Sequence, residues 1–333
     1  MAASAASAGK VCVTGATGFI ATWLVKSLLE RGYVVRATVR DLAKLEKVAH
    51  LRQLPGASER LELVEAELLS QGSFDAAMNG CVGVFHTASP FFFKNITDPQ
   101  TQLIDPAVKG TLNVLKACVS ANGVKKVVLT SSTAAVIYNR ANKSGALVDE
   151  TWFSDPEYCK EVQAWYVLSK TLAEKAAWDF AKENNLHMVT INPAMVLGRL
   201  LQPTLNTSSE AILTLLNGTS KTYPNAALGW VGVKDVVNAH ILAYEDVGAF
   251  GRYLCVERVV HYSDIANLLS KMYPEYDVPT KCVDEVSPRA PVYDVSTEKL
   301  KKLGLRFQPL EEILKECVES LKERNFLQGN PKL

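Results

Sequence analysis

Tyr166 and Lys170 stand four residues apart in the stretch AWYVLSKTLAEKAAW, which has the apolar spacing of one amphipathic helix. Residues four apart lie on the same face of a helix, so the phenol and the ammonium group are predicted to be neighbours. A cation about 4 Å away contributes about 4 kcal/mol at an effective dielectric constant of about 20, enough to lower the pKa of a tyrosine from about 10 to about 7. The pair therefore predicts a general acid, against the alternative of an ordinary core tyrosine beside a lysine with a buried stem.

The stretch LTSST places the hydroxyl groups of Thr130, Ser131 and Ser132 at the end of a predicted strand. In doubly wound sheets ligands bind at the carboxyl ends of the strands, where a hydroxyl group can hydrogen-bond a substrate carbonyl. Serine and threonine at a strand end are also ordinary turn residues. Together with Tyr166 and Lys170, however, Ser132 is predicted to polarise a carbonyl group.

The stretch VTGATGFIATWLV follows the first predicted strand and opens the first helix, with Gly15, Gly18 and Ala21 in a G-x-x-G-x-x-A pattern. Glycine permits a tight turn and close approach of a pyrophosphate, whose charge is met by free amides and the positive end of the helix. A glycine-rich turn between strand and helix can also be only a turn. Its place between the first strand and the first helix, with a second strand at the right spacing, predicts a dinucleotide site.

The second predicted strand ends at Arg40, where an NAD-binding fold usually carries an acidic residue for the ribose 2′-hydroxyl group. Arg40, with Lys44 or Lys47 just beyond it, could instead hold a 2′-phosphate by charge-assisted hydrogen bonds. Asp41 is the opposing signal, because it could bind the 2′-hydroxyl group or cap the next short helix. The balance favours NADP(H) as cofactor.

Six β-rich runs alternate with helix-like segments through residue 196, which predicts a parallel sheet with helices on both faces. The fold class is thus α/β, a doubly wound parallel sheet of the Rossmann type over residues 10–196. The helix-like segment GTLNVLKACVSANG is predicted to end at Gly123 as its C-cap. The predicted strands are residues 10–15, 34–40, 61–68, 82–89, 125–132 and 187–194.

From about residue 197 several prolines interrupt shorter elements, and a charged helix closes the chain. Residues 197–330 are predicted to form mainly a smaller mixed α/β substrate-binding lobe, with some segments returning to the Rossmann domain. The small, polar residues 1–9 are predicted to be a disordered tail, without the long apolar run of a signal peptide.

Composition narrows the class of protein further. A formal net charge of +1, with 48% hydrophobic and 21% charged residues, gives no sign of nucleic-acid or membrane-surface binding. No apolar run approaches the roughly 20 residues that span a bilayer. The seven cysteines form no C-x-x-C pair and the five histidines are scattered, so buried reduced thiols, a cytoplasmic protein and no metal site are expected. A monomer or a homodimer is expected.

With these residues in place, the chain resembles the extended short-chain dehydrogenase/reductases, which carry T-G-x-x-G-x-x-[GA], a serine and Y-x-x-x-K. More narrowly, it is similar to a plant group of dihydroflavonol reductases, cinnamoyl-CoA reductases and aromatic-aldehyde (phenylacetaldehyde) reductases. The similarity runs from about Lys10 to Phe326. The stretches VFHTASPF, LTSSTAAV, YVLSKTLAEKAAW and INPAMVLGRLLQPTLNTSS carry it.

The resemblance implies an NADP-dependent oxidoreductase in which Ser132, Tyr166 and Lys170 are the catalytic residues. Tyr166 and Lys170 would also bind the cofactor, with Lys170 on the nicotinamide ribose. Arg40 and Lys47 would hold the 2′-phosphate. Beside adenine this chain has Glu67 where relatives usually carry aspartate. The other implied cofactor-binding residues are Gly15, Thr17, Gly18, Phe19, Ile20, Leu68, Thr87, Ala88, Ser89, Pro193, Ala194, Met195, Val196 and Ser208.

The departures from the group concern the substrate. Cinnamoyl-CoA reductases typically carry N-W-Y-C-Y-G-K around the catalytic tyrosine, where this chain has AWYVLSK. Their CoA-contacting histidine, lysine and arginine align with Ala211, Thr214 and Tyr262, which lack those polar or cationic heads. Ile137 stands where dihydroflavonol reductases have a substrate-sensing asparagine, and an apolar residue suits a plain ring better.

These departures favour reduction of an aromatic aldehyde, such as phenylacetaldehyde or a cinnamaldehyde-like compound, to the primary alcohol. Phe91, from the stretch SPFFF, is expected to line the substrate site together with Ser132, Ile137 and Tyr166, although it could equally be tucked into the core. A hydroxycinnamoyl-CoA reductase, a dihydroflavonol or polyketide-pyrone ketone reductase, and a catalytically idle NADPH-binding protein are the alternatives.

Overall fold

A sheet of seven parallel strands forms the centre of the computed structural model, which describes residues 8–89, 96–141 and 145–328. The strand order is β11-β7-β5-β4-β1-β2-β3. From β1 the chain adds β2 and β3 on one side and then β4, β5, β7 and β11 on the other, as in doubly wound folds. This confirms the predicted fold class. The strands are β1 (Lys10–Thr14), β2 (Val34–Val39), β3 (Leu61–Glu65), β4 (Gly83–His86), β5 (Lys126–Thr130), β7 (Met188–Pro193) and β11 (Gly251–Cys255).

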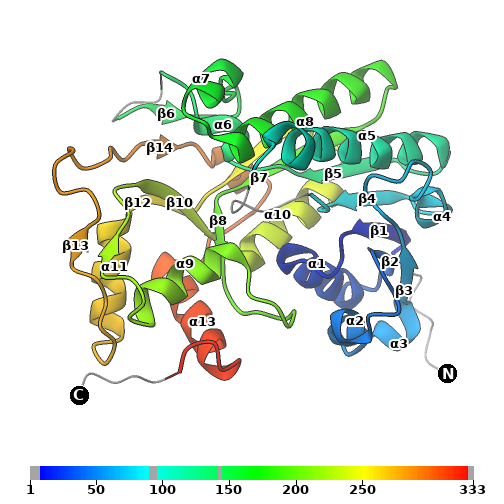
Figure 1. Cartoon of the computed structure of the whole chain (residues 1–333). Helices are drawn as coiled ribbons and strands as arrows, with labels where there is room; N and C mark the ends of the chain where they lie inside the picture. The colour runs from blue at the N-terminus through cyan, green and yellow to red at the C-terminus, as the bar shows by residue number, and fades with distance from the viewer. Residues whose placement is uncertain (1–7, 90–95, 142–144, 329–333) are drawn as a thin grey trace.

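Helices cover both faces of this sheet (Figure 1). On one face α5 (Asp105–Ser120), which continues from the π-helical turn η1 (Gln100–Ile104), packs along α8 (Trp165–Glu183). On the other face α1 (Phe19–Glu30) packs against α10 (Val233–Glu245). Shorter elements join them: α2 (Leu45–Arg52), α3 (Ala57–Arg60), α4 (Asp75–Met78), α6 (Ala134–Ile137), β6 (Leu147–Val148) and α7 (Pro156–Glu161).

The C-cap prediction at Gly123 is wrong, because the C-cap of α5 is Ala121. Helix α5 ends at Ser120, and the residue with positive φ is Asn122, at 49°. Asparagine tolerates the left-handed conformation because its short polar side chain can bond to nearby backbone. Gly123 instead passes close to other backbone, since a Cβ atom there would lie 3.1 Å from the carbonyl oxygen of Cys81.

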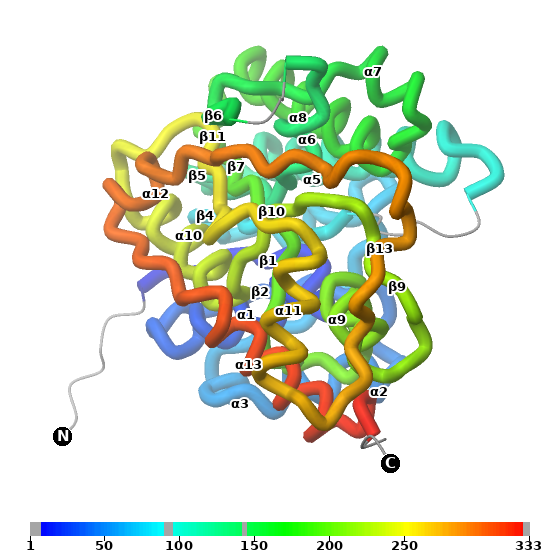
Figure 2. The backbone as a smooth tube through the Cα atoms, turned by 90° about the vertical axis from the view of Figure 1, so that its left-hand side faces the viewer, coloured from blue at the N-terminus to red at the C-terminus, as the bar shows by residue number. Residues whose placement is uncertain are grey.

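The residues after β7 build a second, three-stranded sheet of β8 (Met195–Leu197), β10 (Ala227–Gly232) and β12 (Arg258–His261). Figure 2 shows the segment from β13 to α12 running along the outside of the molecule. The remaining elements of this lobe are α9 (Thr207–Leu216), β9 (Thr222–Tyr223), α11 (Tyr262–Met272), β13 (Lys281–Cys282), β14 (Asp294–Val295), α12 (Glu298–Lys302) and α13 (Leu310–Glu323).

One hydrophobic core continues from the nucleotide-binding half into the C-terminal lobe. Trp230 on β10 is fully buried and meets the Tyr262 ring edge-on, with 5.7 Å between centroids. Trp23 on α1 donates from Nε1 to the carbonyl oxygen of Arg199, 2.8 Å away. Six of the seven cysteine thiols are buried, and Cys282 is half-buried. None of the helices in the described ranges is long and apolar enough to cross a membrane.

Segments far along the chain return to the first half. Helix α10 packs on β5 and β7, and β11 pairs with β7 as the seventh strand of the main sheet. The sequence pattern did not single out β11, because its pairing partner lies about sixty residues earlier. The predicted tail, residues 1–9, lies almost entirely outside the described residues.

Candidate active site

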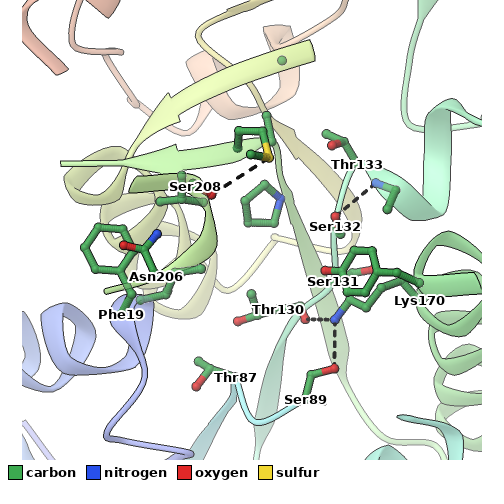
Figure 3. A pocket seen from close by; sticks show the side chains of 18 of the residues that line it. Phe19, Thr87, Ser89, Thr130, Ser131, Ser132, Thr133, Lys170, Asn206 and Ser208 are labelled. Carbon is green, nitrogen blue, oxygen red and sulfur yellow. Dashed lines mark hydrogen bonds between the residues drawn. The ribbon is translucent and has the colours of Figure 1, made fainter. Parts of the chain in front are cut away.

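A cavity of about 430 Å³ opens where the carboxyl ends of the main strands meet the C-terminal lobe. This is the edge at which doubly wound sheets bind their ligands. Figure 3 shows hydroxyl groups from several strand ends around it. Of the residues predicted from sequence, the structure brings into its lining Gly15, Gly18, Phe19, Ile20, Thr87, Ser89, Ser132, Ile137, Tyr166, Lys170, Pro193, Ala194, Met195, Val196 and Ser208.

The glycine-rich turn needs a backbone conformation and a close approach that residues with a Cβ atom do not allow. Gly15 has φ 66°, and a Cβ atom on it would lie 3.0 Å from Ala88. The turn is held from β2, because the Gly15 amide donates to Thr38 Oγ1 at 3.1 Å and the Ala16 amide to the Thr38 carbonyl at 2.9 Å. Helix α1 then begins after Gly18 with no side chain capping it. The first-turn amides therefore face the cavity without a side-chain acceptor, as an anion site requires.

The ends of β1 and β4 are tied together beside this turn. Thr14 Oγ1 accepts from the amides of Thr87 and Ala88, each at 3.1 Å, and pairs with His86 Nδ1 at 2.8 Å. Burial, reinforced by the charge of Lys170, lowers the pKa of His86 to about 3. This histidine is thus neutral at physiological pH and holds the strand ends in place.

Ser132, Tyr166 and Lys170 meet in the cavity from two elements that pack together. Ser132 follows β5, and the other two lie one turn apart on α8, which packs against α6. The Ser132 hydroxyl group hydrogen-bonds the phenol of Tyr166. Lys170 is 8% exposed, and its Nζ donates to the Thr130 carbonyl at 3.3 Å and to Ser89 Oγ at 3.5 Å (Figure 3). The three groups can therefore surround one carbonyl oxygen.

The pKa of Tyr166 is shifted in the direction opposite to the predicted one. Burial raises the pKa of Tyr166 above its ordinary value, and the hydrogen bond with Ser132 only works against that rise. The ammonium group of Lys170 donates to the end of β5 and to Ser89, which follows β4. Tyr166 consequently keeps its proton throughout the neutral range. It can still protonate an alkoxide, which is a much stronger base than a phenolate.

The protonation state of Lys170 leads to a pH prediction. Burial lowers the pKa of Lys170 to about 8, while Glu174 opposes the decrease. The ammonium form prevails below this pH and is lost above it. If carbonyl reduction needs this cation, kcat/KM should fall as pH rises through about 8. Steady-state rates between pH 6 and 10 measure this, and a rate that stays flat to pH 10 would contradict it.

Six predicted cofactor residues lie outside the cavity lining, and one predicted substrate residue lies outside the described ranges. Phe91 is the latter. Glu67 and Leu68 follow β3 at the same edge of the sheet, and Ala88 packs on Gly15. The remaining three, Thr17, Arg40 and Lys47, belong to the turn after β1 and the segment after β2.

In the segment after β2, Asp41, the opposing signal to Arg40, already has partners of its own. Asp41 Oδ1 accepts from the Ala43 amide at 2.9 Å, and its other oxygen pairs with Lys44 at 3.3 Å. It does not cap α2, whose N-cap is Lys44. Arg40 follows directly after β2 and Lys47 lies in the first turn of α2, and both are exposed. Their position leaves two cations available to a phosphate there.

The cavity also contains residues that the sequence analysis missed. Asn206 stands beside Phe19 in Figure 3, and its buried Oδ1 atom has no hydrogen-bond partner among the described residues. Tyr138 and Val167 line the part near Ser132, and Leu228 comes from β10 of the lobe. The signal for Asn206 was present, because it lies in the stretch LQPTLNTSS on which the family resemblance rested.

These features fit NADP(H). The glycine cradle and the uncapped start of α1 offer partners to a pyrophosphate. The unsatisfied oxygen of Asn206 can accept a hydrogen bond from a ribose hydroxyl group, and the cations after β2 suit a 2′-phosphate. Ser89, Lys170 and Pro193, which the family resemblance places beside the nicotinamide end, also line the cavity. A nicotinamide cofactor supplies the hydride when it is bound.

Comparisons with known proteins agree with this geometry. Residues 11–254 match the NAD dependent epimerase/dehydratase family. The chain is 59% identical to cinnamoyl-CoA reductase CAD2 of Medicago truncatula over 317 residues, which is 95% of this chain and 96% of that protein. The crystal structure of vestitone reductase from alfalfa is 38% identical with a TM-score of 0.82, over 96% of this chain and all of that one.

A second solved structure bears on the cofactor. The yeast methylglyoxal/isovaleraldehyde reductase Gre2, complexed with NADPH, is 28% identical with a TM-score of 0.83, over 96% of this chain and all of that one. Its bound NADPH agrees with the predicted cofactor. The predicted resemblance and the predicted class of chemistry, a nicotinamide-dependent oxidoreductase, are confirmed. The chain belongs to the NAD dependent epimerase/dehydratase family, as one of its extended short-chain reductases.

Proposed function

We propose that this protein reduces an aromatic aldehyde to the primary alcohol with NADPH. The aldehyde oxygen accepts hydrogen bonds from Ser132 and Tyr166, and Tyr166 gives its proton to that oxygen as negative charge develops on it. Lys170 lies close enough to stabilise the developing charge and, by the family resemblance, binds the nicotinamide ribose. The roles of these three residues are part of the proposal.

The observation that supports an aldehyde most is the make-up of the cavity beyond Ser132. Within the described part of the chain, Lys170 is the only basic side chain that lines it. The wall near Ser132 includes Ile137, Tyr138 and Val167, which suit an aromatic ring. A CoA thioester, by contrast, brings phosphates that need cationic partners.

The three positions aligned with CoA-contacting residues support the same choice. Ala211 has no polar head, and the Thr214 hydroxyl group donates to the Glu210 carbonyl at 2.8 Å within α9. Tyr262 is buried against Trp230 and does not line the cavity. None of these three residues carries a positive charge that could bind a CoA 3′-phosphate.

Reduction of a hydroxycinnamoyl-CoA thioester is the second candidate. It is favoured by the name of the Medicago relative, a cinnamoyl-CoA reductase that matches nearly the whole chain. The carbonyl chemistry at Ser132 and Tyr166 would be the same, so only the recognition of the rest of the substrate separates the two candidates.

A substrate panel decides between them. With NADPH, we expect kcat/KM for phenylacetaldehyde or cinnamaldehyde to exceed that for feruloyl-CoA by at least about tenfold, the equivalent of one lost charge-assisted contact. Steady-state kinetics of all three substrates with one enzyme preparation measure it. Dominance of the thioester would overturn the aldehyde proposal, and a dihydroflavonol added to the panel tests ketone reduction.

The setting of the reaction is also proposed. Seven unpaired cysteines, six of them buried, suit a reducing compartment such as the cytoplasm. A small-molecule substrate and a monomer or homodimer complete the proposal.

A further inference from the structure

The carboxylate of Glu174 lies one helical turn beyond Lys170 on α8 and is 1% exposed. Four donors satisfy it. Oε2 accepts from Ser131 Oγ at 2.5 Å and from Asn192 Nδ2 at 2.8 Å, and Oε1 accepts from Arg252 Nε at 2.6 Å and from Trp178 Nε1 at 3.2 Å. A buried carboxylate with this many partners is fixed in both position and orientation.

Two of these partners lead directly to the end of β5. Ser131 precedes Ser132 in the chain, and the same Asn192 Nδ2 that binds Glu174 also donates to the Ser132 carbonyl at 3.2 Å. The adjoining amides of Ser131 and Thr133 are held by β7 carbonyls at 2.8 and 2.9 Å. The Ser132 backbone is therefore positioned partly through the Glu174 carboxylate.

Arg252 ties this carboxylate to the rest of the fold. It comes from β11, the strand that returns from the C-terminal lobe, and is 6% exposed. Beyond Glu174, its guanidinium group donates to the carbonyl groups of Glu150, Trp152 and Ala135. It also stacks 3.8 Å above the Phe153 ring. One cation thus joins β11, α6 and the segment before α7 to α8.

Of the titratable groups around Lys170, Glu174 is the one whose charge favours the ammonium form. On α8 the titratable neighbours are Tyr166 and Glu174, and of these Glu174 raises the pKa of Lys170. From β4 comes His86, which is neutral. The helices α5 and α7 also pack on α8, but their charged residues point outward, in pairs such as Asp105 with Lys109 and Glu157 with Lys160.

We propose that Glu174, held in place by Arg252, is a positioning residue that keeps Lys170 charged and Ser132 aligned for carbonyl reduction. This inference rests on the proposed roles of Ser132, Tyr166 and Lys170. It makes the site depend on the return strand β11, 78 residues beyond Glu174 in the chain.

The pH dependence of Glu174→Gln tests the inference. Removal of the negative charge should make Lys170 lose its proton more readily, so the alkaline limb of kcat/KM for the aldehyde should move down by about one pH unit. At pH 8 the rate should fall about five- to sixfold, and at pH 6 by only about a tenth. Glu174→Asp, which keeps the charge, should retain the wild-type limb. A limb that does not move in Glu174→Gln, or a loss of rate equal at every pH, overturns the inference.

Two further variants keep the test decisive even if Glu174→Gln destabilises the fold. Glu174→Gln leaves Arg252 buried and unpaired, so Glu174→Gln/Arg252→Gln is made as well, with two amides and no buried charge. The alkaline limb of this double variant should also move to lower pH, because Glu174, and not Arg252, acts on the pKa of Lys170; a wild-type limb would overturn the inference. Asp235→Asn removes another buried carboxylate, one at the start of α10, and should leave the limb in place. An equal shift in Asp235→Asn would also overturn the inference.

Lys170→Met separates a failure of this inference from a failure of the proposed function. If Lys170→Met keeps wild-type turnover and its alkaline limb, the catalytic assignment is wrong and the inference falls with it. If Lys170→Met loses turnover while Glu174→Gln keeps the wild-type limb, only the inference is overturned. NADPH binding, followed by fluorescence titration, shows for each variant whether the cofactor site has remained intact.

Discussion

Tyr166→Phe is expected to lower kcat/KM for the aldehyde by roughly 10²- to 10⁴-fold, the usual contribution of a positioned general acid. The phenylalanine ring keeps the packing but has no proton to give to the carbonyl oxygen. Since the hydroxyl group of Tyr166 is a small part of the cavity wall, the NADPH dissociation constant should change by less than about threefold. Single-turnover kinetics and fluorescence titration measure the two quantities.

Tyr33→Phe is the matched control for this variant. Tyr33 is also a buried tyrosine, but its hydroxyl group bonds to Glu245 at 3.1 Å, on the α10 side of the sheet. Its removal should reduce stability slightly and leave turnover near that of the wild type. Comparable turnover in Tyr166→Phe and wild type would show that the phenol is not the proton donor, and would favour a protein that only binds the cofactor.

Arg40→Ala is expected to raise the NADPH dissociation constant by roughly 10- to 100-fold, because a hydrogen bond to a charged group contributes about 1.5–3 kcal/mol. NADH lacks the 2′-phosphate, so its dissociation constant should change by less than about threefold. Titration of both cofactors against both proteins measures the difference. The effect should shrink at high ionic strength, since Arg40 is exposed.

The control for this second prediction is Arg31→Ala. Arg31 is likewise exposed, but it follows the far end of α1 and pairs with Glu245 at 3.2 Å. Its loss should alter the binding of neither cofactor. Equal weakening of NADPH and NADH in Arg40→Ala would mean that Arg40 does not contact the 2′-phosphate, and Asp41 would then need to be reconsidered as a partner of the ribose.

Short-range patterns predicted much of this molecule correctly. The six β-rich runs all became strands of the main sheet, because continuous apolar runs are what parallel strands buried on both faces require. The helical spacing of Tyr166 and Lys170 placed both on the cavity wall. The glycine pattern placed Gly15 and Gly18 there as well, since the positive φ of Gly15 is a local demand that the residue type itself reveals.

The electrostatics of the site could not be read in the same way. A helical spacing gives the neighbours of Tyr166 on α8, but not the depth at which the phenol is buried, and burial is what raises its pKa. Likewise, the partner of Glu174 was not predictable, because Arg252 is 78 residues away and reaches it only after β11 has paired with β7.

The sequence by itself determined the parallel sheet, the nucleotide turn and the choice of Ser132, Tyr166 and Lys170, because each depends on spacing within one element or on residue type at a strand end. The tertiary structure decided which protons those residues keep and which side chains complete the cavity, Asn206 and Leu228 among them. Burial and charge act through space, so groups from β11, β10 and the segment before α9 influence the site as much as its neighbours in the sequence do.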